Sequence, residues 1–372
     1  MLPDPSGLSG LRPSFLGRRA PAALAAAIPL LLMVGLFILF QGGATRPPAP
    51  STAFPTSQDP IEVYFTAPGS AAGESFRGGP DAVLAEAIDR AEESVDVAVY
   101  DFNLWSLRDA LIRAAGRGVQ VRLVTDSDNI LRPEVAALEG VGIPVLGDRR
   151  EPLMHHKFTV IDGAEVWTGS MNYTLTDGYL NDNNLVRIRS AELAESFTRE
   201  FEEMFLEDRF GALSLADTPR RTPVVAGTQL EVYFSPDDEP AARLVELVLE
   251  ARESVEFLAF SFTLDPLREA LVERAAQGVR VRGVIETDQA GNAGSELTAL
   301  REAGLDVRLD GNPRNMHHKV IVIDGSLVIT GSYNFSTSAE ESNDENVLIV
   351  HSGDIASLFL IEFERVFDLA AP

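Results

Sequence analysis

Two copies of one short phrase hold most of the chain's histidines and all of its lysines. The copies read Met-His-His-Lys-Phe-Thr-Val-Ile-Asp-Gly at residues 154–163 and Met-His-His-Lys-Val-Ile-Val-Ile-Asp-Gly at residues 316–325. Only two of the 31 Lys and Arg residues are lysines, and each lies in one copy. An imidazole can act as a nucleophile or carry a proton, and a compact ammonium offers three donors that a planar guanidinium cannot replace. The phrases therefore predict two matched sets of acid–base and anion-binding groups.

Each phrase continues at the same distance to a Gly-Ser-x-Asn sequence, at residues 169–172 and 331–334. The pattern His-x-Lys-x4-Asp-x6-Gly-Ser-x-Asn is therefore present twice. It resembles the duplicated signature of the phospholipase D superfamily, and the resemblance extends from about residue 61 to the C-terminus. The predicted catalytic residues are His155, Lys157, Asp162, His317, Lys319, Asp324 and Glu345. The predicted substrate-binding residues are Ser170, Asn172, Ser332 and Asn334.

The resemblance implies that the two copies face each other in one active site that acts on a phosphodiester. One histidine attacks phosphorus to give a phosphohistidine, while the other protonates the leaving group and later activates water. The lysines and asparagines hold the phosphoryl oxygens through the transition state. Neither a metal ion nor another cofactor is expected.

An acidic residue that the family places after each motif is present in only one copy. The second copy has Glu345, whereas the first has Asn183 at the matching position. From their order in the sequence, Glu345 is expected to lie beside His317 and Asn183 beside His155. A carboxylate favours the protonated form of a neighbouring imidazole. This pairing predicts that His317 is the acid and that His155 is the nucleophile.

Strand periodicity separates the two adjacent histidines of each phrase. If the phrase enters a strand, neighbouring side chains point to opposite faces. His155 and Lys157 then share the face of the site, while His156 and, in the second copy, His318 point into the packing. For the aspartate near the end of each phrase, the resemblance implies a structural role at the end of the strand.

The duplication extends well beyond the two phrases. Residues 61–65 resemble 230–234, and residues 94–100 resemble 254–260. Repeats of this length indicate a duplicated domain. Strands alternate with helices in each unit, which predicts an α/β sandwich with a largely parallel sheet. The resemblance implies two α/β/α sandwich units packed about a pseudo-twofold axis.

A continuous apolar run precedes the duplicated units. Residues 20–40 have about the length of a membrane-spanning helix, and the arginines before them favour an N-terminus in the cytoplasm. The alternative is a cleaved signal peptide, which would make the protein secreted. Both interpretations place the catalytic part outside the cytoplasm. The predicted divisions are a cytoplasmic segment at 1–19, a transmembrane anchor at 20–40, a disordered tether at 41–60, one unit at 61–211, a linker at 212–227 and a second unit at 228–372.

Composition narrows the class of substrate. The chain has no cysteine, which excludes disulfides and Cys-based metal sites, and its formal net charge is −25 at pH 7. Such a surface repels polyanions at long range. The favoured function is hydrolysis of phospholipid headgroups by a membrane-anchored enzyme. A metal-independent nuclease of the same superfamily, a phosphatidyltransferase of the cardiolipin synthase kind and a non-catalytic scaffold are the alternatives. Because one chain carries both motifs, a monomer is expected.

Overall fold

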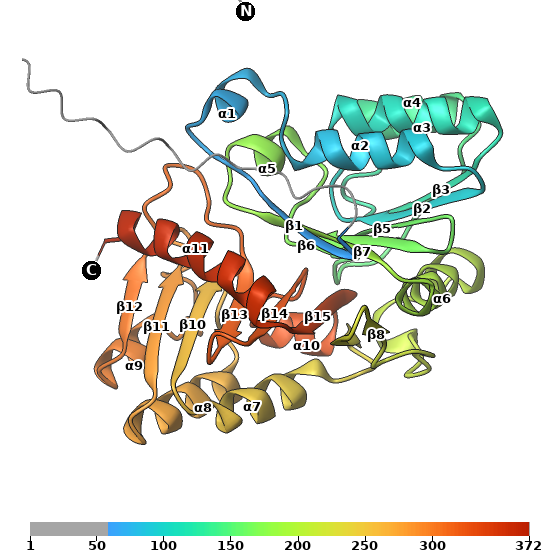
Figure 1. Ribbon diagram of the computed structural model, residues 1–372. Coiled ribbons are helices and arrows are strands. Elements are labelled where there is room, and N and C mark those ends of the chain that lie inside the picture. Colours follow the sequence, from blue (N-terminus) through green and yellow to red (C-terminus); the bar gives the residue numbers. More distant parts are fainter. Residues whose placement is uncertain (1–58, 372) are drawn as a thin grey trace, which may run out of the picture. The chain divides into compact units, whose positions relative to one another are not determined.

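The computed structural model describes residues 59–371, which fold around two mixed β-sheets (Figure 1). The predicted cytoplasmic segment, the anchor and most of the tether lie outside the described residues. Among the helices between residues 59 and 371, none is both long enough and apolar enough to cross a bilayer.

The first sheet has seven strands in the order β1-β7-β6-β5-β2-β3-β4. The strands are β1 (Ile61–Phe65), β2 (Ser94–Val99), β3 (Gln120–Thr125), β4 (Val145–Gly147), β5 (Lys157–Ile161), β6 (Glu165–Gly169) and β7 (Asn184–Arg189). Only the β2–β3 and β3–β4 pairs are parallel. The expectation of a largely parallel sheet is therefore wrong, because the remaining pairs are antiparallel. Residues 162–164 join β5 to β6, and a connection this short can form a hairpin but not a parallel crossover.

The second sheet repeats this arrangement in the order β12-β11-β10-β13-β14-β15-β9-β8. Its strands are β8 (Val224–Val225), β9 (Thr228–Ser235), β10 (Ser254–Ala259), β11 (Arg280–Ile285), β12 (Asp306–Leu309), β13 (Lys319–Ile323), β14 (Leu327–Gly331) and β15 (Glu345–His351). Again only the pairs β10–β11 and β11–β12 are parallel. The short strand β8, within the predicted linker, pairs with β9 at the edge of this sheet.

The helices form layers on the sheets (Figure 1). They are α1 (Ala71–Ser75), α2 (Pro80–Arg90), α3 (Trp105–Arg117), α4 (Pro133–Gly140), α5 (Leu175–Tyr179), α6 (Ala191–Glu207), α7 (Pro240–Glu250), α8 (Asp265–Ala276), α9 (Leu297–Glu302), α10 (Thr337–Glu341) and α11 (Gly353–Leu369), with a 3₁₀ turn at Gly211–Leu213. Helix α6 packs against β2, β3, β5 and β6, and α11 packs against β10, β11, β13 and β14. Helix α3 is capped at its C-terminus by Gly118, which has a φ of 94°, in the left-handed region that favours glycine.

One apolar core joins the two units. It contains buried residues from both sheets together with the phenylalanines of α6 and α11, such as Phe197 and Phe359. Two further cores lie on the other faces of the sheets, one under α2 and α3 and one under α7 and α8. Because burial of apolar surface is the main stabilising term in folding, the shared core fixes the two motifs relative to each other.

Candidate active site

Backbone hydrogen bonds between the two units bring the motifs together. The His155 N–H donates to the carbonyl of Asp344 at 2.9 Å, and the His317 N–H donates to the carbonyl of Asp182 at 2.9 Å. The bonds are reciprocal, as expected for two units related by a pseudo-twofold axis. Each aspartate immediately precedes the residue that carries the orienting side chain of its own unit. Each motif histidine is thus placed against the orienting residue of the other unit.

The side chains show the same pairing across the units: each motif histidine contacts the orienting residue of the other unit. His155 Nδ1 lies 2.7 Å from Glu345 Oε2, and His317 Nδ1 lies 2.9 Å from Asn183 Oδ1. The expected pairing of Glu345 with His317 and of Asn183 with His155 is therefore wrong. An amide oxygen only accepts hydrogen bonds, so His317 carries its proton on Nδ1 in this arrangement. The lone pair of a neutral His317 is then on Nε2.

Each motif lysine lies next to the motif histidine of its own phrase. Lys157 Nζ donates to the carbonyl of His155 at 2.6 Å, and Lys319 Nζ donates to the carbonyl of His317 at 2.7 Å. Burial lowers the pKa of Lys157 to about 8, and burial together with the charge of Lys157 lowers the pKa of Lys319 well below its ordinary value. Within residues 59–371, no group of three or more His, Cys, Asp or Glu side chains is arranged to hold a metal ion. The buried positive charge of this site comes from the lysines, and an anion would stabilise it.

The histidines are also shifted towards their neutral forms. Burial, followed by Lys157 and Lys319, lowers the pKa of His155 well below its ordinary value. Burial and Lys319 lower the pKa of His317 in the same direction. Burial raises the pKa of Glu345 to about 7, although Lys157 opposes this shift. A neutral imidazole is the form that can act as a nucleophile. The negative charge of a bound phosphodiester would favour protonation of the second imidazole.

The glycine of each Gly-Ser-x-Asn sequence is required by a close backbone approach. Gly169 has a φ of 155° and Gly331 a φ of 138°. A Cβ at Gly169 would lie 2.4 Å from the carbonyl oxygen of Asn184, and one at Gly331 would lie 2.2 Å from that of Asn346. No larger residue fits without moving the backbone directly after the orienting residue.

The serines and asparagines of these sequences differ in their surroundings. The Ser170 hydroxyl donates to Asn183 Oδ1 at 2.9 Å, and Ser332 Oγ accepts the N–H of Asn346 at 2.9 Å. Both serines are fully buried, so the geometry supports a role in holding the orienting residues more than one in contacting substrate. Asn172 Oδ1 and Asn334 Oδ1 are buried and have no hydrogen-bond partner among the described residues.

The two motif aspartates do not lie in the site. Asp162 follows β5 at the end opposite Lys157, about 16 Å along the strand at the usual rise per residue. Its carboxylate accepts the N–H groups of Glu92, Glu93 and Ser94. Asp324 accepts the N–H groups at residues 252–254 in the same manner. Their inclusion in the catalytic set is wrong on this geometry, which supports instead the structural role implied by the resemblance.

The second histidine of each phrase points away from the site, as predicted. His156 Nε2 lies 2.9 Å from Glu200 Oε1 on α6, and His318 Nε2 lies 3.0 Å from Glu362 Oε1 on α11. Both histidines are fully buried. They attach the C-terminal helix of each unit to the strand that begins at the motif lysine.

One buried carboxylate in the site was not predicted from the sequence. Asp177 on α5 accepts a hydrogen bond from Asn172 Nδ2 at 2.8 Å, and its Oδ1 lies 3.6 Å from His317 Nδ1. The signal that could have identified it is a difference between the repeats, because the matching residue of the second unit is Ala339.

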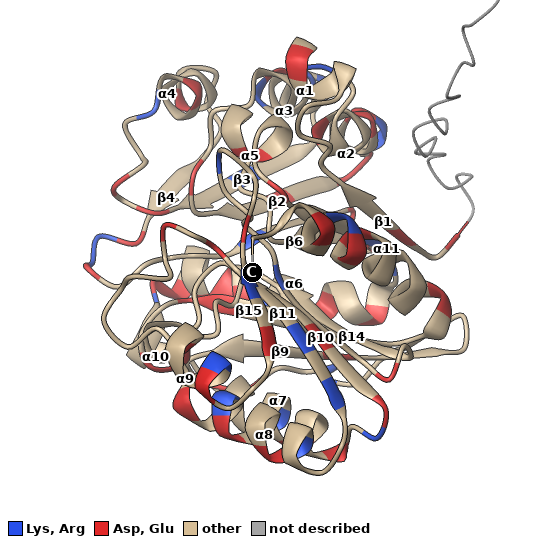
Figure 2. Cartoon of the chain, turned by 90° about the vertical axis from the view of Figure 1, so that its left-hand side faces the viewer, with Lys and Arg blue, Asp and Glu red and all other residues tan. Residues whose placement is uncertain are grey.

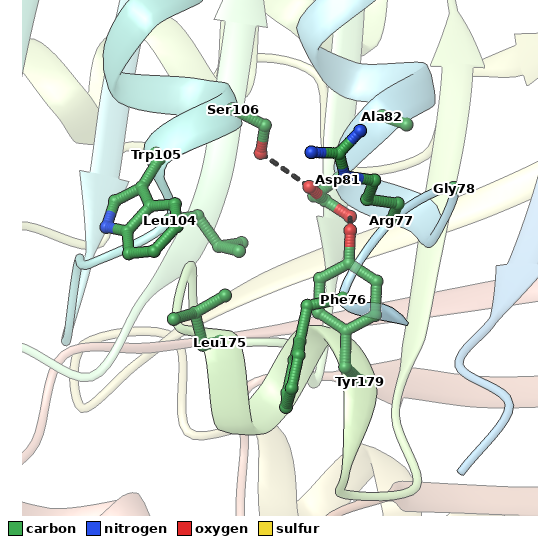
Figure 3. A pocket seen from close by; sticks show the side chains of 10 residues that line it. All are labelled: Phe76, Arg77, Gly78, Asp81, Ala82, Leu104, Trp105, Ser106, Leu175 and Tyr179. Carbon is green, nitrogen blue, oxygen red and sulfur yellow. Dashed lines mark hydrogen bonds between the residues drawn. The ribbon is translucent and has the colours of Figure 1, made fainter. Parts of the chain in front are cut away.

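Helix α5, which carries Asp177, also lines a small pocket. The pocket has a volume of about 230 Å³. Leu175 and Tyr179 line it from α5, together with Trp105 from α3 (Figure 3). The Tyr179 hydroxyl donates to Asp81 at 2.7 Å. This hydrogen bond links the helix that carries Asp177 to α2.

This fold, with two histidine–lysine motifs at the junction of two similar units, defines a known class of protein. Residues 84–205 and 244–367 match the family described as "Cardiolipin synthase, PLD-like domain". The chain therefore belongs to the phospholipase D superfamily.

Individual relatives match parts of the chain. The human protein named "Mitochondrial cardiolipin hydrolase" is 41% identical over 131 residues, which are 35% of this chain and 52% of that protein. A Rickettsia bellii protein named "Phospholipase D" is 30% identical over 133 residues, 36% of this chain and 66% of that protein. The chain thus spans about half to two thirds of these relatives. The structure of phosphatidylserine synthase from Haemophilus influenzae Rd KW20 has a TM-score of 0.58 at 14% identity, covering 83% of this chain and 86% of that one; it shows the fold across both units.

Proposed function

We propose that the chain is a phospholipase D-type phosphodiesterase that hydrolyses phospholipid headgroups through a phosphohistidine on His155, without a metal ion. The observation that carries the proposal is the crossed pair of histidines. Glu345 holds Nδ1 of His155 and Asn183 holds Nδ1 of His317, so the Nε2 atom of each imidazole is left for the reaction. Acid–base and nucleophilic groups in such a constellation suit phosphoryl transfer.

In the first step, Nε2 of His155 attacks phosphorus and the bond from phosphorus to the headgroup oxygen breaks. The Nε2–H of a protonated His317 gives its proton to that oxygen, so the headgroup leaves as a neutral alcohol. The phosphohistidine has imidazolium character, and the Glu345 carboxylate at 2.7 Å from Nδ1 stabilises it. The lysines stabilise the charge on the non-bridging oxygens.

In the second step, water attacks phosphorus and the bond from phosphorus to nitrogen breaks. The neutral His317 now accepts a proton from the water, which restores its protonated form. His155 is released as a neutral imidazole, and the lipid product is a phosphatidate. If another alcohol replaced water, the same step would transfer the phosphatidyl group.

Two observations support a phospholipid as substrate. The relatives described above are named for cardiolipin hydrolase and phospholipase D activity. Acidic residues lie on helices and loops around both sheets (Figure 2), and the formal net charge is −25; such a charge disfavours approach of a polynucleotide. The proposal includes the predicted membrane anchor at residues 20–40, with the catalytic part outside the cytoplasm, and a monomer. An anchor would raise the effective concentration of lipid at the site.

The proposal is tested with the full chain and three substrates in buffer containing EDTA. Labelled phosphatidylcholine and cardiolipin vesicles and single-stranded DNA are incubated separately, and the products are identified. We expect phosphatidate and free headgroup from lipid, with intact DNA. Cleavage of DNA alone would reject the lipid assignment in favour of a nuclease.

Three histidine variants test the shared site. His155→Ala and His317→Ala should each lower the rate by at least about 10²-fold, as expected for loss of a nucleophile or a positioned acid. His351→Ala is the matched control. This histidine lies at the end of β15, forms a hydrogen bond with Glu231 and is not part of either motif. A motif variant that kept more than about a tenth of the wild-type rate would contradict the mechanism.

A further inference from the structure

The two units use different residues to orient the motif histidines. In the second unit, Glu345 contacts His155 directly, and position 339 is an alanine. In the first unit, the residue that contacts His317 is the neutral Asn183, and the position matching the alanine is Asp177. A carboxylate is thus present in both units, but six residues earlier in the first.

Asp177 is surrounded by donors. Its Oδ1 accepts from Asn181 Nδ2 at 2.7 Å and from Asn183 Nδ2 at 3.1 Å. Its Oδ2 accepts from Asn172 Nδ2 at 2.8 Å and from the Thr174 hydroxyl at 3.2 Å. A carboxylate has about four acceptor positions, and these four donors occupy them. The side chain is buried, with a relative exposure of 7%.

The amide of Asn183 has a fixed direction between this carboxylate and the histidine. Its Nδ2 donates to Asp177, so its Oδ1 points to His317 Nδ1, and the Ser170 hydroxyl donates to the same oxygen. Oδ1 of Asp177 itself lies 3.6 Å from His317 Nδ1. The negative charge therefore acts on the imidazole both through the polarised amide and directly across 3.6 Å.

The charge state of Asp177 agrees with this arrangement. Although burial opposes ionisation, His317 and the donating asparagines hold the pKa of Asp177 below its ordinary value. The charged groups that act on His317 are Lys319, Asp177 and Lys157, together with His155. Of these, only Asp177 raises the pKa of His317.

We propose that Asp177 is the positioning residue for the acid of the reaction: through Asn183 it orients His317, and its negative charge favours the protonated imidazole that, with substrate bound, gives its proton to the leaving oxygen. The inference rests on the proposed function. Asp177 also fixes the amide of Asn172, whose second N–H remains available for a phosphoryl oxygen.

The test uses Asp177→Asn in the full chain with phosphatidylcholine vesicles. The amide is nearly isosteric but removes the charge. We expect kcat to fall by about tenfold or more, though less than the ~10²–10⁴-fold attributed to a whole acid–base group. The alkaline limb of the kcat profile should move to lower pH by about one unit, because an opposite charge this close shifts a pKa by at least that amount. Glu341→Gln, an exposed carboxylate on α10, is the matched control and should behave as the wild type.

A substrate with an activated leaving group separates positioning of the acid from damage to the fold. A 4-nitrophenyl phosphodiester needs no proton on its leaving oxygen, so the nitrophenolate burst that reports the first step should slow by less than about threefold in Asp177→Asn. A variant that was merely misfolded would lose both activities. An Asp177→Asn burst on the aryl diester that slowed as much as kcat on the lipid would therefore overturn the inference.

A double variant tests whether the carboxylate can be moved. Asp177→Ala with Asn183→Glu gives the first unit the pair of residues found in the second. We expect it to recover most of kcat and the wild-type alkaline limb. A folded double variant with the low kcat of Asp177→Asn would contradict the proposed role of the charge.

Failure of the inference is distinguishable from failure of the function. If the wild type cleaves lipid and requires His317 while Asp177→Asn has an unchanged rate and pH profile, the inference fails and the function stands. If the wild type cleaves no phosphodiester, or if His317→Ala remains active, the proposed function itself fails.

Discussion

Replacing Glu345 with glutamine isolates the charge beside the nucleophile. Glu345→Gln keeps an acceptor for His155 Nδ1, which lies 2.7 Å away, and so preserves the tautomer with the lone pair on Nε2. What it removes is the negative charge that stabilises the phosphohistidine in the proposed mechanism. The variant should therefore slow formation of the intermediate without altering the fold.

The size of the effect follows from the geometry. Two unit charges about 4 Å apart interact by about 4 kcal/mol at an effective dielectric constant of 20. A hydrogen bond to a charged group contributes about 1.5–3 kcal/mol. Since about 1.4 kcal/mol corresponds to tenfold in rate, the first step should slow by roughly tenfold to 10³-fold. The upper part of this range applies above pH 7, because burial raises the pKa of Glu345 to about 7 and the carboxylate is fully ionised only above that pH.

Rapid mixing with a 4-nitrophenyl phosphodiester measures this step directly, since each phosphohistidine formed releases one nitrophenolate. The Glu345→Gln burst should be slow, whereas Glu341→Gln should give the wild-type burst. On this substrate the Asp177→Asn burst should remain close to that of the wild type. A slow burst is therefore expected for loss of the Glu345 charge and not for loss of the Asp177 charge. A Glu345→Gln burst within about twofold of wild type would refute the stabilising role of the carboxylate.

Three further predictions concern the metal, the lysines and the packing. Turnover should be the same with and without EDTA, and a loss that a divalent ion restores would contradict the mechanism. Lys157→Arg keeps the charge but not the compact ammonium, so kcat should fall by about tenfold or more; an unchanged kcat would show that any cation suffices. Burial, with Glu200 and Asp238, raises the pKa of Asp237 to about 8 from an ordinary 3.8, and its Oδ1 has no hydrogen-bond partner among the described residues. Because the folded state binds this proton more tightly, the contribution of Asp237 to stability is lost as pH rises from about 4 to 8. Asp237→Asn should therefore melt at a higher temperature than wild type at pH 8 but not at pH 4, and a pH-independent difference would contradict this.

Local features of the site could be predicted from the sequence because their causes are local. Alternation along a strand places His155 and Lys157 on one side and His156 on the other, and the structure confirms it. The end of α3 at Gly118 likewise follows from the left-handed conformation that glycine adopts easily.

The partners of the histidines could not be predicted, because they depend on how the units pack. Glu345 and Asn183 follow their own motifs in the sequence, yet each faces the histidine of the other unit. The direction of the strands was also missed, because alternation of strands and helices early in each unit hides the hairpin between β5 and β6. Asp177 could have been identified only by comparing the two repeats at a position outside the motif.

In the proposed mechanism, His155 carries the phosphoryl group while His317 carries the proton. The most direct measurement is to stop turnover of a phosphate-labelled phospholipid under conditions that preserve phosphohistidine, digest the protein and map the label. We predict label on the peptide that contains His155 in the wild type and none in His155→Ala. Label on the peptide that contains His317 would contradict the assignment.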